Sequence, residues 1–124
     1  MKLAILIGAF LIAATAANAN PFENFYDNTA VSTMSDGGKM TYYLNRDGTF
    51  ESHFSDGSVV KGHYTWQDAQ TACFLPTAPP PPPGTKAVCR HYPDTHKVGD
   101  VWTEQANGSP VTDTIVKGRD GLPK

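Results

Sequence analysis

The sequence predicts an all-β domain, a small antiparallel meander of about eight strands stapled by one disulfide. Three observations predict this fold. Past residue 19, no helical hydrophobic period of useful length occurs. Short runs rich in Thr, Tyr, Val and Phe recur instead between Asp-Gly and Asn-Gly turns, which is typical of a meander. The chain also holds two cysteines. We expect an up-and-down barrel or a strongly curled sheet, with a two-sheet sandwich as the alternative.

Residues 1–19 have the pattern of a secretion signal, and residues 20–124 then form a single β domain. Lys2 provides a positive start, residues 3–14 are apolar, and Ala17 and Ala19 fit the small-x-small cleavage pattern. The apolar stretch is shorter than the roughly 18 residues that a membrane span needs. We therefore expect a bacterial periplasmic or secreted protein that has no membrane attachment after cleavage of its signal peptide.

Alternation and turn residues define the expected strands. They lie at 29–34, 39–45, 49–54, 58–66, 71–75, 87–92, 100–105 and 111–117. Two of the turns match each other position by position, and each suits a type I turn followed by a left-handed glycine, Gly48 or Gly57. These two turns predict the register of both hairpins.

In this register Leu44 lies opposite Phe50 and Glu51 lies opposite Lys61. One face then collects mostly apolar residues: Met40, Tyr42, Leu44, Phe50, Phe54, Val60, Tyr64 and Trp66. The other face collects mostly polar residues: Thr41, Tyr43, Glu51, His53, Lys61 and His63. Such a split is typical of a sheet that buries one side. The aromatic segment 20–28 is expected either to plug one end of the barrel or to pack across its outside.

Cys73 and Cys89 are expected to form a disulfide, because two cysteines in a small exported domain usually pair. If they lie on opposite strands, Phe74 faces Val88 beside them. A redox role is disfavoured because the spacing is not that of a C-x-x-C pair. The enclosed Pro-rich loop, residues 76–86, contains five consecutive prolines that favour a polyproline II rod. We interpret it as a stiff exposed connection, and a ligand for an aromatic groove is the alternative.

The sequence contains no recognisable catalytic, cofactor or metal motif. The net charge of −2 is spread along the chain, which argues against a nucleic-acid partner. His53 and His63 would lie about 13 Å apart in the expected register, too far to share one ion. A turn could bring His91 and His96 together, but too few ligands accompany them for a strong metal signal. Most acids occupy Asp-Gly turns, so we expect no enzyme and name no catalytic residue.

Aromatic side chains are the best candidates for binding. Tyr42, Phe50, Tyr64 and Trp66 share one face, and Trp102 is expected to join them. The interior of an eight-stranded barrel either is filled by side chains or holds one small ligand. Because the domain is small and these rings are large, the filled core is the favoured interpretation.

Several stretches occur together in a definite order: N-P-F-E-N-F-Y at 20–26, Y-Y-L-N-x-D-G-T-F at 42–50, G-x-Y-T-W at 62–66, the cysteine pair, and V-G-D-x-W at 98–102. In this order they resemble a set of uncharacterised small exported proteins of alphaproteobacteria. The resemblance implies export and this fold, and it implies no active site. In outline only, the chain is also similar to periplasmic metalloprotease inhibitors and to bacterial lysozyme inhibitors.

The sequence thus predicts a non-enzymatic, periplasmic or secreted β-barrel binding module whose partner is a protein or a small apolar ligand. The alternative is an inhibitor of an exported hydrolase, either a protease or a lysozyme. A carrier needs a cavity behind Tyr42, Tyr64 and Trp66. An inhibitor needs a protruding segment, either residues 20–28 or residues 79–83.

Overall fold

A computed structural model describes residues 20–106 and 108–119 of the chain. This part contains no helix, and therefore none able to span a membrane. Its eight strands are β1 (Thr29–Met34), β2 (Lys39–Leu44), β3 (Thr49–Phe54), β4 (Val59–Asp68), β5 (Thr71–Ala78), β6 (Val88–His91), β7 (Val101–Ala106) and β8 (Ser109–Val116). The prediction of an all-β fold is confirmed, and the predicted strand limits differ from these by three residues at most.

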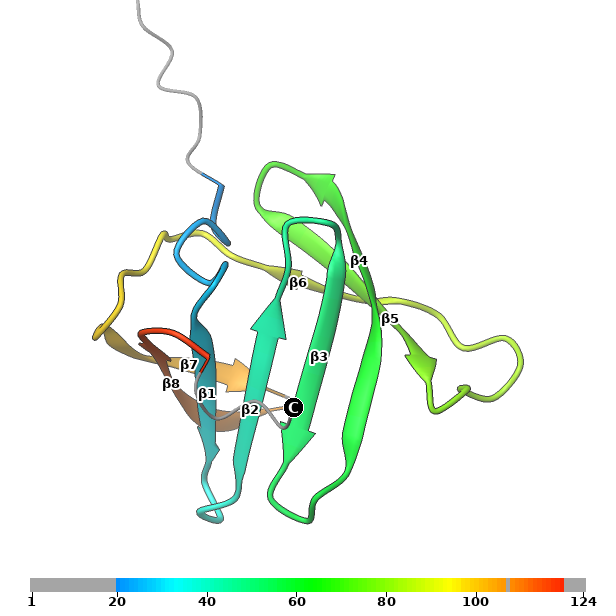
Figure 1. The fold of residues 1–124 in the computed structure, drawn as a ribbon, viewed down its shortest axis with the longest axis horizontal. Coiled ribbons are helices and arrows are strands. Elements are labelled where there is room, and N and C mark those ends of the chain that lie inside the picture. The colour runs from blue at the N-terminus through cyan, green and yellow to red at the C-terminus, as the bar shows by residue number, and fades with distance from the viewer. Residues whose placement is uncertain (1–19, 107, 120–124) are drawn as a thin grey trace, which may run out of the picture.

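The strands form one antiparallel sheet in the order β6-β5-β4-β3-β2-β1-β8-β7 (Figure 1). Each strand pairs with its neighbours in sequence, except that β6 does not pair with β7, and β8 pairs with β1 instead. The β1–β8 pairing curls the sheet on itself, while the interval between β6 and β7 stays open. The molecule is therefore a strongly curled sheet, a half-barrel that does not close.

The two Asp-Gly turns are built as expected. Gly48 and Gly57 have φ angles of 87° and 88°, a region that glycine enters without steric cost. The predicted register is confirmed in both hairpins, with Leu44 opposite Phe50 in one and Glu51 opposite Lys61 in the other.

Gly62 allows the middle of the sheet to bend. The register between β4 and β5 shifts between Lys61 and Gly62, which is the signature of a β-bulge. A Cβ atom added at Gly62 would lie 2.2 Å from the backbone oxygen of Leu75 and 2.7 Å from a ring carbon of Phe50. Only a residue without a side chain therefore fits where β5 and the Phe50 ring both approach β4 so closely.

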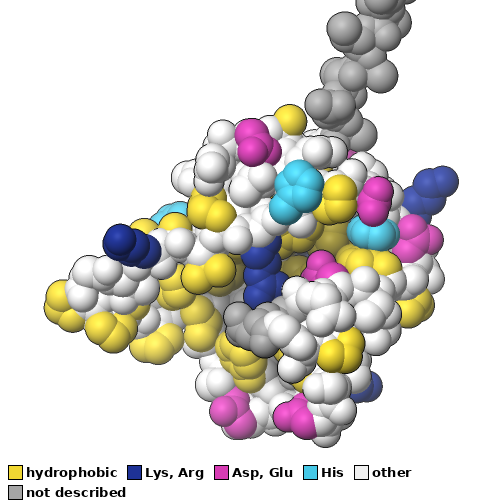
Figure 2. Space-filling view, turned by 180° about the vertical axis from the view of Figure 1, so that it is seen from behind, with side chains coloured by type: hydrophobic (Ala, Val, Ile, Leu, Met, Phe, Trp, Pro, Cys, Tyr) yellow, Lys and Arg dark blue, Asp and Glu magenta, His cyan; other side chains and the backbone are white. Residues whose placement is uncertain are grey.

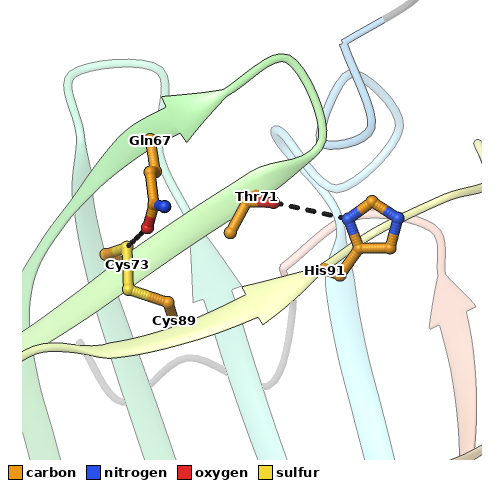
Figure 3. Close-up of a disulfide and its surroundings, with 5 residues drawn as sticks. All are labelled: Gln67, Thr71, Cys73, Cys89 and His91. Atoms are coloured by element: carbon orange, nitrogen blue, oxygen red, sulfur yellow. Dashed lines mark hydrogen bonds between the residues drawn. A yellow bond between two sulfur atoms is a disulfide. The ribbon is translucent and has the colours of Figure 1, made fainter.

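The disulfide prediction is confirmed. Cys73 lies directly opposite Cys89 on the β5–β6 pair, and their sulfur atoms are 2.08 Å apart (Figure 3). Phe74 lies opposite Val88, as expected. The Pro-rich loop projects away from the sheet between these strands (Figure 1), and its side chains are almost all exposed.

Residues 20–28 pack inside the curl rather than across its outside. Phe22 is fully buried and Phe25 is 2% exposed. The Phe22 ring centroid lies 5.2 Å from that of Tyr64 and 4.5 Å from that of Trp66. This segment is also tied to the β6–β7 connection, because the Asn24 side-chain amide donates a hydrogen bond to the backbone oxygen of His96. The core thus consists of the inner face of the sheet and the segment 20–28, which precedes β1.

Tyr43 lies on the outer face of the sheet, as predicted, but it is covered there. Tyr43 belongs to that face by alternation, yet it is only 3% exposed. Its ring lies 5.5 Å from that of His53 and is covered by the Arg119 guanidinium, 5.3 Å from the ring centroid. Arg119 is held there by hydrogen bonds to three acceptors, including the backbone oxygen of Leu44. Alternation assigned Tyr43 to the correct face but could not show that the C-terminal segment returns to cover it.

Candidate ligand-binding cavity

A cavity of about 230 Å³ lies on the inner face of the curled sheet. Seen from behind the sheet, it is a hollow with hydrophobic side chains in its depth (Figure 2). Its apolar lining consists of Met40, Leu44, Phe50, Phe74, Pro76 and Val88. Its polar lining consists of Ser32, Tyr42, Ser52, Arg90, Tyr92 and Glu104. The cavity is therefore apolar over half of its lining residues and carries charged groups as well.

Strand alternation explains why these residues meet. In β2 every second residue faces inward, so Met40, Tyr42 and Leu44 line the cavity together. The charged residues come from the two unpaired edges, Arg90 from β6 and Glu104 from β7. The open interval between β6 and β7 thus places two charged side chains on the cavity.

The structure divides the five aromatic residues that the sequence singled out. Tyr42 and Phe50 line the cavity. Tyr64 and Trp66 pack around Phe22 of the segment 20–28, and Trp102 lies 6.2 Å from the ring of Phe25 in the same segment. The segment fills that part of the inner face, so Tyr64, Trp66 and Trp102 serve the core. Tyr42 stacks on Phe25 of the segment and Phe50 belongs to the core as well, but both also line the cavity.

A buried acid lies behind the cavity. Asp113 of β8 is fully buried, and the Ser32 hydroxyl donates a hydrogen bond to its Oδ1. Its other carboxylate oxygen, Oδ2, is also buried and has no hydrogen-bond partner among the described residues. Glu104 lies close enough to Asp113 for its charge and for hydrogen bonding between the two carboxyls to raise the pKa of Glu104. When it is protonated, Glu104 can therefore donate a hydrogen bond to Asp113.

The surroundings of Glu104 favour its protonated form. Burial, which is the largest cause, together with hydrogen bonding to Asp113 and the negative charge of Asp113, raises the pKa of Glu104 to about 7. The positive charge of Arg90 partly offsets this rise in pKa. Near neutral pH, Glu104 is therefore divided between its protonated and ionised forms.

Two phenols complete the polar side of the cavity. Burial raises the pKa of Tyr42 and of Tyr92 well above the ordinary value, and the negative charges of Asp113 and Glu104 act in the same direction. Both hydroxyls therefore stay protonated and can donate hydrogen bonds. Tyr92, Arg90 and Glu104 were not among the predicted site residues. For Asp113 a signal did exist in the sequence, since it occupies an inward position between the apolar Val111 and Ile115 of β8.

The histidines occupy separate surroundings. His91 lies 3.3 Å from the Thr71 hydroxyl at the β5–β6 pair (Figure 3). His96 is stacked on Trp102, with ring centroids 3.7 Å apart. His53 Nε2 lies 2.7 Å from a carboxylate oxygen of Glu51 on the outer face. Within residues 20–106 and 108–119, no three His, Cys, Asp or Glu side chains are placed to hold a metal ion.

Comparison of the chain with protein-family models, with curated proteins and with solved structures found no match. Its function is therefore inferred from the geometry of the cavity and from the chemistry of its lining.

Proposed function

We propose that this protein is a non-enzymatic binding module that holds a small, largely apolar ligand in the inner cavity. The observation that carries the proposal is the cavity itself, about 230 Å³ in a core that is otherwise closely packed with aromatic rings. Protein interiors contain few voids larger than a water molecule. A concave, mostly apolar hollow with a few polar groups in its lining is the usual form of a small-ligand site.

The size of the cavity limits the ligand. An engineered apolar cavity of roughly 150 Å³ accepts benzene. The present cavity therefore accommodates one ring with a short chain, or an aliphatic group of similar bulk. A drug-sized or polymeric ligand would extend beyond it.

The proposal is tested by filling the cavity from within. Ser52→Trp places a large side chain into the lining, whereas Thr65→Trp places the same side chain at an exposed position of β4. We expect the neutral probe 3-phenylpropan-1-ol to bind the unmodified protein and the Thr65→Trp variant, and not the Ser52→Trp variant, in titration calorimetry. Failure of the probe to bind the unmodified protein, or equal binding to both variants, would contradict the proposal.

We also propose that the protein acts in an oxidising compartment outside the cytoplasm, as the expected signal peptide implies. The Cys73–Cys89 disulfide supports this, because such bonds persist mainly in the periplasm or after secretion. The signal itself lies outside the described residues. Intact-mass analysis of cell fractions is expected to find a periplasmic or secreted chain that starts at residue 20 and lacks two hydrogens. A full-length cytoplasmic chain with two free thiols would contradict export.

Inhibition of an exported hydrolase remains the alternative, and one observation favours a particular route for it. The segment 20–28 is packed into the core, whereas the Pro-rich loop projects into solvent (Figure 1). An inhibitor would therefore act through the loop. Assays of exported proteases and of lysozyme with the intact protein and with a variant that lacks residues 80–83 test this alternative. Inhibition that depends on the loop would favour it over ligand carriage.

A further inference from the structure

The mouth of the cavity carries a cation that the fold does not use. Arg90 lines the cavity from β6, and no carboxylate of the described residues forms an ion pair with it. The ion pairs of the described residues instead involve Arg46 and His53, which do not line the cavity. A permanent positive charge beside an apolar hollow is suited to a ligand that is itself apolar at one end and anionic at the other.

We infer that the ligand is a monocarboxylate, with its apolar body in the cavity and its carboxylate on Arg90. This inference rests on the proposed function and adds the chemical class of the ligand. A guanidinium presents its N–H groups in a planar fork that matches the two oxygens of a carboxylate. The apolar residues opposite, such as Leu44 and Phe50, would enclose the rest of the molecule.

Glu104 favours an anion over a cation at this place. It lines the cavity from β7, across the open interval from Arg90. Because its pKa is about 7, Glu104 itself is uncharged in a large part of the population near neutral pH, and Asp113 is buried and does not line the cavity. An ammonium group would instead meet the permanent charge of Arg90. The Tyr42 and Tyr92 hydroxyls, which also line the cavity, are donors from which a carboxylate can accept hydrogen bonds.

The lining also suggests an aromatic body for the ligand. Phe50, Phe74 and Tyr92 supply ring faces and edges around the hollow, and the Phe50 and Phe74 rings already meet edge to face at 5.4 Å. Aromatic rings pack well in such arrangements. A ring with a short carboxylate chain therefore fits the volume, the lining and the charge together, and 3-phenylpropanoate is a suitable probe.

The test uses three probes that share one carbon skeleton: 3-phenylpropanoate, 3-phenylpropan-1-ol and 3-phenylpropan-1-amine. In titration calorimetry at about pH 6.5 we expect the acid to bind about tenfold or more tightly than the alcohol, and the amine to bind most weakly. Arg90→Gln is expected to reduce the affinity for the acid to that for the alcohol, so that the variant no longer distinguishes the two probes. Lys61→Gln, which removes a positive charge from the outer face, is expected to change neither.

The outcomes separate the two proposals. Equal binding of acid and alcohol, or full affinity of the Arg90→Gln variant for the acid, would overturn the carboxylate and leave the cavity as a binding site. Tightest binding of the amine would also overturn it and would point to Glu104 as the recognising group. If none of the three probes binds, the proposed function fails, and this inference fails with it. Binding of the alcohol by Arg90→Gln also shows that this variant is folded.

Discussion

The pKa values of carboxyl groups in this chain shift in opposite directions in two different surroundings. Asp47 and Asp56 lie in exposed turns, where hydrogen bonds from Thr49 and Ser58 lower their pKa values. These are the local roles that an Asp-Gly turn predicts. Glu104 is half-buried beside a second carboxyl, and its pKa moves upward instead. All three side chains end in a carboxyl group, so their surroundings determine whether the folded state favours the ionised or the protonated form.

The shift at Glu104 predicts a pH dependence of stability. Because its pKa rises from 4.5 to about 7 on folding, the folded state binds more protons than the unfolded state between these values. Glu104 therefore stabilises the fold fully below about pH 4.5, and this contribution is lost as the pH rises through about 7. Urea unfolding between about pH 5 and 8 is expected to show a falling free energy of unfolding. Glu104→Gln, which keeps a donor for Asp113, is expected to lose this slope, and an unchanged slope in that variant would contradict the assignment.

Two strands, β4 and β6, are held in the sheet in different ways. β4 lies between β3 and β5 and bends at Gly62, where the neighbouring backbone leaves no room for a side chain. β6 is a four-residue edge strand that pairs only with β5, and the disulfide joins it to that partner. The bend of β4 thus depends on the absence of a side chain at Gly62, whereas β6 is held to β5 by a covalent bond.

Gly62→Ala is expected to destabilise the protein by about 2 kcal/mol or more, because overpacking against rigid neighbours costs roughly 1–3 kcal/mol. The added Cβ would meet a backbone oxygen, which cannot rotate away as a side chain could. Denaturant unfolding measures the change, with Thr65→Ala, an exposed substitution on the same strand, as the control. Similar small losses in both variants would show that β5 does not approach β4 as closely as described.

Replacing both cysteines by alanine is expected to lower the free energy of unfolding by about 3 kcal/mol, the chain-entropy value for a loop of this length. Sixteen positions separate Cys73 from Cys89. Because Arg90 follows Cys89 on the same short strand, the affinity for 3-phenylpropanoate should also fall, while the affinity for the matched alcohol falls less. Unfolding curves and calorimetry measure the two effects. Retention of full stability would mean that β6 is held by its backbone pairing alone.

At the scale of the whole molecule, the core depends on a segment that belongs to no strand. Phe22 touches the rings of five other aromatic residues: Phe25, Tyr64, Trp66, Phe74 and Tyr92. The sheet is curled but open, so its inner face would be exposed at one end without residues 20–28. The segment covers one part of the inner face and leaves the cavity open on another part. The core and the candidate site therefore share the inner face of the same sheet.

Phe22→Ala is expected to cost about 3–5 kcal/mol, the range for truncating a buried aromatic side chain. Phe54→Ala removes the same atoms from a side chain that is 39% exposed and is expected to cost clearly less. Thermal or denaturant unfolding compares the two variants. Equal effects would mean that residues 20–28 are not part of the cooperative core.

The sequence by itself determined the strands, both Asp-Gly hairpin registers and the cysteine pairing. These features follow from alternation and turn chemistry, which act over a few neighbouring residues. It assigned Tyr43 to the correct face and still missed its burial, because the covering Arg119 is 75 positions away from Leu44, whose oxygen anchors it. Local patterns indicate the face to which a side chain points, but they do not show which distant segment of the chain will cover it.

Only the tertiary structure decided that β8 pairs with β1, that β6 and β7 stay apart, and that residues 20–28 enter the core. The candidate site depends on all three. Ser32 and Asp113 are 81 positions apart, and they meet because the sheet curls far enough to bring β8 beside β1. Arg90 and Glu104 share a cavity because two edges remain unpaired. The physical reason is that curvature and edge pairing are properties of the whole sheet, summed over every strand, and no single stretch of sequence encodes them.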